Sequence, residues 1–385
     1  MMRPVDRTPR NDDYEKMRVL VSDDQQDVLE AIRLLLKGAG HSAETVDSPR
    51  SALAAVEREP FDLVLMDMNY SRDTTSGDEG LTLLDRLLER DGSRPVIVMT
   101  AWSSVDLAVE AMRRGAADFI QKPWDNVRLL ATIEKQANRS QQRNTAKSEL
   151  EIARHVQQRL LPQHAQPLKT LAFAGRCVPA RAIGGDYYDF LDLGPGRLGV
   201  LLADVSGKGV AGALLTANLQ ASFRSQLELG VKHGKALLSS VNKLFHESTP
   251  AEYFATMFYA EYRDQNRELR YINCGHPDAL LFRANGKMER LEATALPIGI
   301  FSWWKCEEKS VHLGPGDVVV IISDGVLEAG VDGGEEFGEA RFKEAVQLSA
   351  SAGVDALLDQ VLDEVHQFSP GQQSDDVTMV ALKGF

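Results

Sequence analysis

The sequence predicts two domains of different fold class, a doubly wound α/β domain followed by an α+β domain, joined by one long helix. Three observations lead to this prediction. Short apolar runs alternate with amphipathic helical patterns over about the first 130 residues, which favours a parallel sheet covered on both faces. The next stretch, Val127 to Leu161, contains no glycine or proline. Beyond Pro167 the pattern changes to runs typical of antiparallel strands, with helical patterns in separate blocks.

Five apolar runs predict the strands of the first domain. They are Arg18–Ser22, a weaker run at Ser42–Val46, Leu63–Asp67, Val96–Thr100 and Asp118–Gln121. Amphipathic patterns between them predict helices over Val28–Leu36, Leu81–Leu88 and Val105–Arg113. Ligands in such folds bind beyond the carboxyl ends of the strands, and polar residues collect there. These residues are Asp23, Asp24, Asp67, Thr100 and Lys122.

The three aspartates at this sheet edge need a counter-charge. Close carboxylates raise one another's pKa, and Mg²⁺, which prefers oxygen ligands, would resolve the conflict. Lys122 could then neutralise an added phosphoryl group, and the Thr100 hydroxyl could donate a hydrogen bond to it. An aspartate held by Mg²⁺ and facing a lysine is well placed to accept a phosphoryl group as a nucleophile.

Residues 17–130 resemble the receiver domain of two-component response regulators. The resemblance rests on VLVSDDQQDV, FDLVLMDMNY, VIVMTAW and DFIQKPW, in that order. It implies that Asp67 accepts its phosphoryl group from a sensor histidine kinase. The implied Mg²⁺ ligands are Asp23, Asp24, Asp67 and the backbone carbonyl of Asn69. The implied switch residues are Thr100, Phe119 and Lys122, and the Lys122–Pro123 bond is expected to be cis. The loop after Asp67 is longer than in the commonest receivers. The alternative is an ordinary flavodoxin-like domain with surface acids.

Residues 131–162 form the predicted connector. Its latter part places Ala146, Leu150, Ala153 and Leu160 on one heptad seam, with Gln157 at the remaining position. A narrow apolar seam with one polar position is typical of a short coiled coil, in which a buried polar residue can set the register. The sequence therefore predicts a coiled-coil-like helix that joins two copies of the chain into a homodimer. The alternative is a helix packed on its own domain.

Over residues 167–385 the sequence predicts an antiparallel β-sandwich flanked by helices. Turn signals such as Asn285-Gly286 separate several of its apolar runs. The predicted strands include Leu198–Ala203, Ala255–Tyr262, Leu269–Asn273, Ala279–Phe282, Val318–Ser323 and Val377–Leu382. The predicted helices are Ala211–Leu229, Lys235–His246, Ala340–Ala350 and Asp355–Gln367.

Four separated acidic motifs mark this second domain. Their aspartates are Asp186, Asp204, Asp324 and Asp375, and the last three adjoin predicted strands. Four aspartates that converge from strand ends would need cations, and no histidine or cysteine partner favours zinc. Two Mg²⁺ or Mn²⁺ ions ~3.5–4 Å apart could bind there with a bridging hydroxide that attacks phosphorus in line. Taken singly, each aspartate could equally be a turn or cap residue.

Residues 149–385 resemble the PPM-type (protein phosphatase 2C-like) enzymes, and most closely their bacterial RsbU/SpoIIE-like branch. The motifs include IGGDYYDF, LLADVSGKGVAGALL, VVVIISDGVLEA and SDDVTMVAL. The resemblance implies a metal-dependent protein serine/threonine phosphatase that acts on an anti-anti-sigma-like phosphoprotein. The implied ligands of two Mn²⁺ or Mg²⁺ ions are Asp186, Asp204, Asp324, Asp375 and the Val205 carbonyl. Asp376 is expected to support them. Ser206 stands where eukaryotic relatives carry a histidine, and His276 is interpreted as a structural turn residue, so the general acid stays unassigned.

The motifs together predict a response regulator whose output is dephosphorylation of phosphoserine or phosphothreonine on a partner protein, controlled by phosphorylation at Asp67. The competing hypothesis is a pseudophosphatase adaptor that binds its partner without hydrolysis, although an adaptor would not need all four aspartates. A net charge of −13 and the lack of a helix-turn-helix pattern disfavour nucleic-acid binding. No apolar run approaches the ~20 residues that span a bilayer. Because the N-terminus is polar and the three cysteines are widely separated, we expect a cytoplasmic protein.

Overall fold

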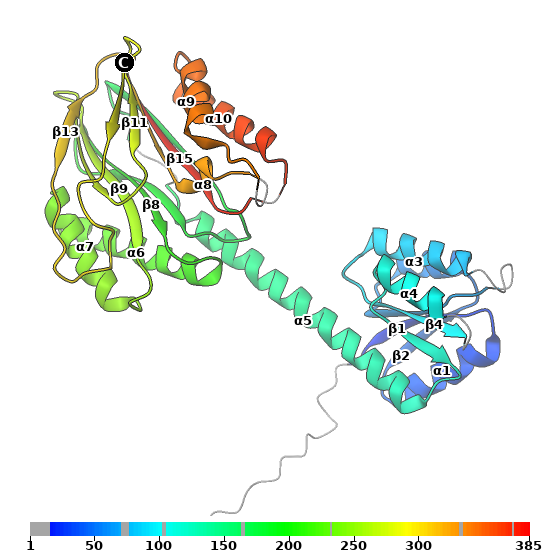
Figure 1. Cartoon of the computed structure of the whole chain (residues 1–385). Coiled ribbons are helices and arrows are strands. Elements are labelled where there is room, and N and C mark those ends of the chain that lie inside the picture. The colour runs from blue at the N-terminus through cyan, green and yellow to red at the C-terminus, as the bar shows by residue number, and fades with distance from the viewer. Residues whose placement is uncertain are drawn as a thin grey trace, which may run out of the picture. The chain divides into compact units, whose positions relative to one another are not determined.

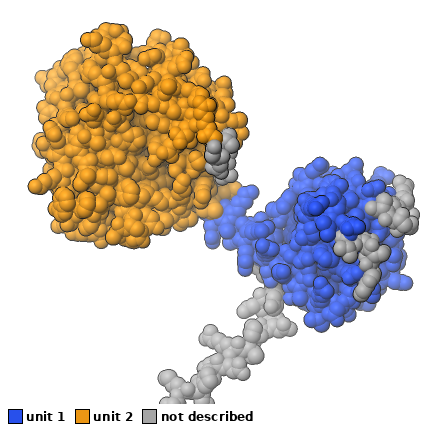
Figure 2. All heavy atoms as spheres, viewed as in Figure 1, with its two compact units in different colours: residues 1–149 blue, residues 150–385 orange. Residues whose placement is uncertain are grey.

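Two compact units make up the chain, residues 1–149 and residues 150–385 (Figure 2). The structure, a computed structural model, describes residues 16–70, 77–101, 105–162, 166–231, 233–330, 334–371 and 373–385. Residues 71–76, which form most of the long loop predicted after Asp67, and the polar N-terminal residues 1–15 lie outside the described residues.

The N-terminal unit is built on a five-stranded parallel sheet with the order β2-β1-β3-β4-β5 (Figure 1). Its strands are β1 (Arg18–Ser22), β2 (Ser42–Val46), β3 (Leu63–Asp67), β4 (Val96–Ala101) and β5 (Asp118–Lys122). Its helices are α1 (Gln26–Gly38), α2 (Pro49–Arg58), α3 (Asp78–Arg90), α4 (Val105–Arg114) and the first part of α5 (Asn126–Gln158). Apolar side chains of α1 and α5 cover one face of the sheet, and α2, α3 and α4 cover the other. The predicted doubly wound α/β fold is confirmed.

Helix α5 crosses the boundary between the two units. Near its start Leu129, Ile133 and Ala137 are buried in the N-terminal unit. Residues 141–150 are exposed on every side of the helix. Further along, Ile152 and Val156 are 62% and 58% exposed. The long helix is therefore observed much as predicted, although it ends at Gln158 rather than at residue 161.

The C-terminal unit is a sandwich of two five-stranded sheets, which confirms the predicted α+β class (Figure 1). The first sheet has the order β13-β10-β9-β8-β7 and the second β12-β11-β14-β15-β6. The strands of the first sheet are β7 (Asp186–Asp192), β8 (Arg197–Val205), β9 (Ala255–Arg263), β10 (Glu268–Cys274) and β13 (Lys309–His312). Those of the second are β6 (Leu171–Val178), β11 (Ala279–Phe282), β12 (Met288–Leu291), β14 (Val318–Ile322) and β15 (Val377–Gly384). The helices are α6 (Val210–Glu228), α7 (Gly234–Ser248), α8 (Asp324–Leu327), α9 (Gly338–Ser349) and α10 (Val354–Phe368).

Three apolar layers hold this sandwich together. The middle layer lies between the sheets and includes Val200, Phe258, Ile321 and Val380. Helices α6 and α7 cover the outer face of the first sheet, and α9 and α10 cover the outer face of the second. The central strands β14 and β15 have an apolar layer on each face of their sheet. Because adjacent side chains on a strand point to opposite faces, all of these positions are buried, and the two strands carry almost continuous apolar sequence.

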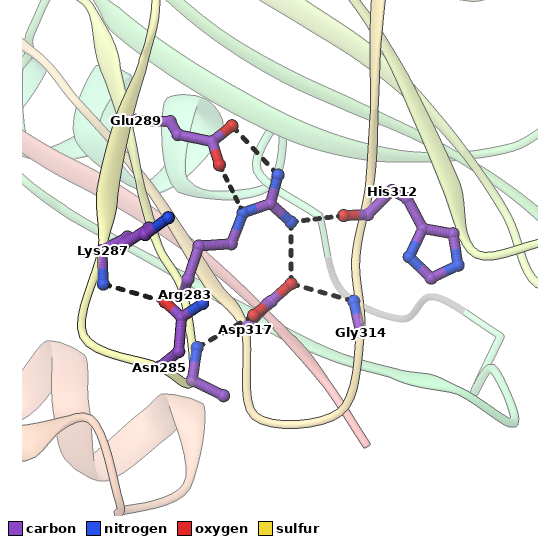
Figure 3. Close-up of polar contacts among 8 residues, drawn as sticks. Arg283, Asn285, Lys287, Glu289, His312, Gly314 and Asp317 are labelled. Atoms are coloured by element: carbon purple, nitrogen blue, oxygen red, sulfur yellow. Dashed lines mark hydrogen bonds and ion pairs between the residues drawn. The ribbon is translucent and has the colours of Figure 1, made fainter.

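A network of paired charges ties the two sheets together near the β11–β12 hairpin (Figure 3). The Arg283 guanidinium donates to both carboxylate oxygens of Glu289, at 2.7 and 3.0 Å, and to the His312 carbonyl that ends β13. It also donates to Asp317, whose carboxylate accepts from the Gly314 and Ala284 N–H groups. Burial alone would raise the pKa of Asp317, but these hydrogen bonds and the Arg283 charge lower it.

None of the helices in the described part of the chain combines the length and the apolar character needed to cross a membrane.

Candidate metal centres

The acidic site of the N-terminal unit lies where β1 and β3 end. Asp23 and Asp24 follow β1 directly, and Asp67 is the last residue of β3. One oxygen from each carboxylate lies within 4.8 Å of the other two. Since β1 and β3 are parallel neighbours, their carboxyl ends meet at one edge of the sheet, as predicted from the sequence.

Lys122 supplies a positive charge to this site. Its Nζ lies 2.6 Å from Asp23 Oδ2 and 2.9 Å from Asp67 Oδ1, at the end of β5. Burial raises the pKa of Asp67, while the Lys122 charge and hydrogen bond act to lower it. The site is thus a buried group of like charges with one cation at its border.

The other receiver-like residues are distributed around this edge. Thr100 is buried near the end of β4, whereas the Phe119 side chain on β5 is 42% exposed. The Lys122–Pro123 peptide bond is cis, as expected. The Asn69 Oδ1 atom is buried and finds no hydrogen-bond partner among the described residues. The predicted ligand at this position is the backbone carbonyl of Asn69, two residues after Asp67.

In the C-terminal unit each sheet contributes two of the four predicted aspartates. Asp186 opens β7 and lies directly opposite Asp204 of β8 in the antiparallel register. Asp324 is the first residue of α8, just after β14, and Asp375 precedes the neighbouring strand β15. The structure therefore gathers four motifs that are separated by as many as 189 residues in the sequence (375 − 186).

These carboxylates are close enough to change one another's ionisation. Burial and then the Asp204 charge raise the pKa of Asp186 well above its ordinary value. Burial, followed by the Asp324 and Asp375 charges, raises the pKa of Asp204 to about 7. Burial and the Asp375 charge raise the pKa of Asp324. An added positive charge would lower the raised pKa of all three carboxyl groups at once.

The residues of this second site fit divalent cations. Their side-chain donors are carboxylate oxygens, which Mg²⁺ and Mn²⁺ prefer. Asp186 is only 6% exposed, and its Oδ2 finds no hydrogen-bond partner within the described ranges. The oxygens are less tightly gathered than in the N-terminal site, because only the Asp23–Asp24–Asp67 group of the described residues brings three acidic ligand atoms within 4.8 Å. The nearby Lys208 Nζ contacts Asp375 Oδ2 at 2.8 Å.

Asp376 fixes the backbone of the Gly184-Gly185-Asp186 segment. Its Oδ2 accepts hydrogen bonds from the N–H groups of Gly185 and Asp186, at 2.7 and 3.2 Å. A Cβ atom at Gly184 would come within 2.2 Å of this carboxylate, so the segment approaches it as only glycine can. A Cβ at Gly185 would lie 2.7 Å from the Val205 carbonyl oxygen, the predicted backbone ligand. The two glycines are therefore required by close packing at the site.

His276 is buried beside Thr256 and Asn273, which fits the structural role favoured from the sequence. It is 3% exposed, and its ring Nδ1 lies 2.9 Å from Thr256 Oγ1. Its backbone N–H donates to Asn273 Oδ1. Burial lowers the pKa of His276 to about 3, so its ring is neutral near pH 7 and is a poor proton donor. The Ser206 hydroxyl accepts from the Phe254 N–H and so anchors a loop.

Two polar contacts at this site were not predicted from the sequence. Lys208 reaches the carboxylate of Asp375 and the carbonyl of Ser374. The sequence could have indicated this contact, because Lys208 lies in the same DVSGKG motif as Asp204. The second contact joins Gln157, near the end of α5, to Gly184. Nothing in the local sequence connects these two residues, which lie 27 positions apart.

A separate family model matches each unit. The response regulator receiver domain model matches residues 19–134, and the Stage II sporulation protein E (SpoIIE) model matches residues 194–384. The phosphoserine phosphatase RsbU of Bacillus subtilis is 29% identical over 238 residues, covering 62% of this chain and 70% of RsbU. The response regulator FleR of Pseudomonas aeruginosa is 39% identical over 120 residues, covering 31% of this chain and 24% of FleR.

One solved structure supports the fold of the C-terminal unit. The SiaA-PP2C domain of Pseudomonas aeruginosa superimposes with a TM-score of 0.56 at 20% identity, covering 63% of this chain and 98% of that domain. At this level of identity the likeness concerns the fold alone. The β-sandwich of the C-terminal unit is thus of the PP2C type.

Proposed function

We propose that this chain, which combines a response-regulator receiver domain with a protein serine/threonine phosphatase domain of the SpoIIE family, dephosphorylates a partner protein under the control of Asp67. The observation that carries the proposal is the convergence of Asp186, Asp204 and Asp324 in a site that raises the pKa of all three. A buried like-charge cluster of this kind has a use when cations and a phosphoryl group bind to it.

In this proposal Asp186, Asp204, Asp324 and Asp375, together with the Val205 carbonyl, hold two Mn²⁺ or Mg²⁺ ions. When bound, the ions would supply an activated water molecule and neutralise negative charge on the phosphoryl group. The side chain of Asp376 keeps Asp186 in place through the backbone, and Lys208 lies at the exposed edge of the site, where a phosphoryl group would arrive. No covalent enzyme intermediate is needed.

The receiver domain is proposed to regulate this output. Asp23, Asp24, Asp67 and the Asn69 carbonyl would hold Mg²⁺, and a sensor histidine kinase would donate the phosphoryl group to Asp67. Lys122, already within 2.9 Å of Asp67, would then bind the new phosphoryl oxygens. Thr100 and Phe119 would respond by repacking, and α5 would carry the change onward.

The proposal extends to the partner protein and to the assembly. RsbU is named a phosphoserine phosphatase, which supports a phosphoserine substrate. The resemblance to the RsbU/SpoIIE-like branch extends this proposal to phosphoserine or phosphothreonine on an anti-anti-sigma-like protein. The exposed Ile152 and Val156 on α5 support a homodimer formed through this helix, because an apolar stripe on an exposed helix favours association. A cytoplasmic location completes the proposal.

The decisive experiment measures Mn²⁺-dependent hydrolysis of p-nitrophenyl phosphate and of a phosphoserine protein by the full chain. We expect activity with Mn²⁺ and its loss in Asp324→Asn, with a conservative change at the exposed Asp363 as the matched control. A chain that binds the phosphoprotein but releases no phosphate with Mn²⁺ or Mg²⁺ would support the adaptor hypothesis instead.

A further inference from the structure

A hydrogen bond between two buried hydroxyl groups, the Ser22–Tyr70 pair, joins strand β1 to the segment that follows β3. The Tyr70 hydroxyl lies 2.8 Å from the Ser22 Oγ, and it also donates a longer hydrogen bond to the Ser22 carbonyl, at 3.4 Å. Ser22 is fully buried and Tyr70 is 3% exposed, in the apolar layer that α2, α3 and α4 cover. Because a hydroxyl group buried without a hydrogen bond is costly, each residue stabilises the other.

Each member of the pair is next in the chain to a predicted Mg²⁺ ligand of the receiver site. Ser22 is followed by Asp23, and Tyr70 is preceded by Asn69, whose backbone carbonyl is the predicted ligand. That carbonyl group and the Tyr70 Cα atom belong to one planar peptide unit. The bond to Ser22 therefore limits where the Asn69 carbonyl oxygen can lie relative to Asp23.

The carboxylates of the same site are held by other groups. Asp23 Oδ2 contacts the Lys122 Nζ at 2.6 Å, and Asp23 Oδ1 accepts from the Gln25 N–H at 2.9 Å. Lys122 also contacts Asp67 Oδ1, at 2.9 Å. The Ser22–Tyr70 pair thus supports the backbone ligand, whereas Lys122 supports the carboxylates.

We propose that Tyr70 is a positioning residue that holds the Asn69 carbonyl in place for Mg²⁺ through its bond to Ser22. The inference rests on the proposed function, because it concerns the ion that phosphorylation of Asp67 requires. One oxygen from each of the three carboxylates of the site lies within 4.8 Å of the other two. A carbonyl oxygen already held beside them would add a fourth ligand with little rearrangement of the backbone, which should strengthen Mg²⁺ binding.

The alternative is that this hydrogen bond only stabilises the fold of the N-terminal unit. In that case loss of the Tyr70 hydroxyl would lower the fraction of folded protein, and fewer molecules would be phosphorylated at every Mg²⁺ concentration. A positioning role predicts a different result, because the folded protein would still accept a phosphoryl group once enough Mg²⁺ is present. The two roles are therefore separable by experiment.

The test uses the full chain with Tyr70→Phe, which keeps the aromatic ring and removes the hydroxyl. Tyr262→Phe is the matched control, because it removes a buried phenol hydroxyl that is bonded to Thr170 in the C-terminal unit. Mg²⁺ binding is measured by calorimetry, and Asp24→Asn identifies the isotherm of the receiver site. We expect Tyr70→Phe to weaken that binding about 10-fold, as is typical when a group supporting a metal ligand is lost. We expect the control to match wild type.

Phosphorylation of Asp67 by acetyl phosphate, followed over a range of Mg²⁺ concentrations, gives a second readout. In Tyr70→Phe the half-saturating Mg²⁺ concentration should rise about 10-fold, while the maximal rate should stay as in wild type. The double variant with Ser22→Ala should match Tyr70→Phe alone, because both changes remove the same hydrogen bond.

Three results would overturn the inference. They are an unaltered Mg²⁺ affinity in Tyr70→Phe, a lower maximal rate at an unchanged half-saturating concentration, and effects of Ser22→Ala and Tyr70→Phe that add. Absence of phosphorylation in wild type would count against the proposed function alone, because the calorimetric comparison needs no phosphoryl transfer.

Discussion

Both acidic sites of this chain bring several carboxylates close together, but the two sites differ in how the repulsion between these charges is reduced. In the receiver domain Lys122 pairs with both Asp23 and Asp67, so that site includes its own cation. In the phosphatase domain Asp204 lies among several further carboxylates, and Lys208, whose side chain is 57% exposed, contacts Asp375 at the edge of the cluster. From this difference we expect the receiver site to keep its geometry without metal, whereas the phosphatase site should need added cations to hold its carboxylates together.

The strongest way to break this comparison is to remove a carboxylate that the cations need. Asp204→Asn should lower Mn²⁺-dependent phosphatase turnover by at least about 100-fold, because loss of a direct ligand should exceed the 10–100-fold effect of losing a supporting group. Steady-state kinetics at several Mn²⁺ concentrations measure the effect. Phosphorylation of Asp67 by acetyl phosphate should remain as in wild type. Turnover that stays near wild type would show that Asp204 is not part of the machinery.

A second change should make the receiver site resemble the phosphatase site. Lys122→Met removes the built-in cation and leaves Asp23, which is fully buried, without its ion-pair partner. Breaking a buried pair in this way costs about 3 kcal/mol of local stability in the absence of metal. Hydrogen exchange of β1 and β3 in the full chain measures the loss, and Mg²⁺ should restore protection more strongly in the variant than in wild type. Equal protection in both proteins would contradict the built-in role of Lys122.

A smaller effect should follow from loosening the support of the phosphatase site. Asp376→Ala removes the acceptor for the Gly185 and Asp186 N–H groups and should weaken Mn²⁺ binding by about 10–100-fold. Calorimetry of the full chain measures the affinity. The exposed Asp363→Ala serves as the control. An affinity equal to wild type would mean that the glycine segment keeps its conformation without Asp376.

The smallest effect concerns pH. Because the pKa of Asp204 is raised to about 7 from an ordinary value of 3.8, the folded state binds this proton more tightly than the unfolded state. The resulting stabilisation is present at low pH and is lost as the pH rises through about 7. The metal-free protein should therefore unfold a few degrees lower at pH 8 than at pH 6 in the transition of its phosphatase domain. Calorimetric scans should show a weaker pH dependence in Asp204→Asn, and a flat wild-type profile would refute the assignment.

Much of the fold follows from local sequence because its central strands are buried on both faces. The bounds of β1, β3 and β11, and of the edge strand β2, were predicted as they are observed. Most of the aspartates of both sites were found because they adjoin predicted strands, whereas Asp186 was found from its Gly184-Gly185-Asp186 motif. The sandwich was predicted from turn signals between apolar runs. These patterns are local, so no tertiary information is needed to detect them.

Other elements could not be predicted because tertiary partners override their local pattern. Strand β7 has the sequence DYYDFLD, whose acids hide its alternation. One of them, Asp189, is fully buried and is compensated by Arg224 of α6 and the Tyr187 hydroxyl. Helix α8 is only four residues long, and Gly175 and Arg176 interrupt the apolar sequence of β6. The contact between Gln157 and Gly184 depends on packing between distant segments, which no local pattern encodes.

The solvent-surrounded stretch of α5, residues 141–150, has a consequence for how such proteins diversify. A segment without side chains buried in its own chain imposes few demands on sequence beyond the heptad pattern, so a different sensory domain could be joined to the helix there. Each inserted residue advances a helix by about 100° and 1.5 Å. The number of inserted residues, which sets this rotation, would therefore matter more than which residues are inserted. Insertions of seven residues, close to two full turns, should preserve signalling, whereas insertions of two should invert or silence it.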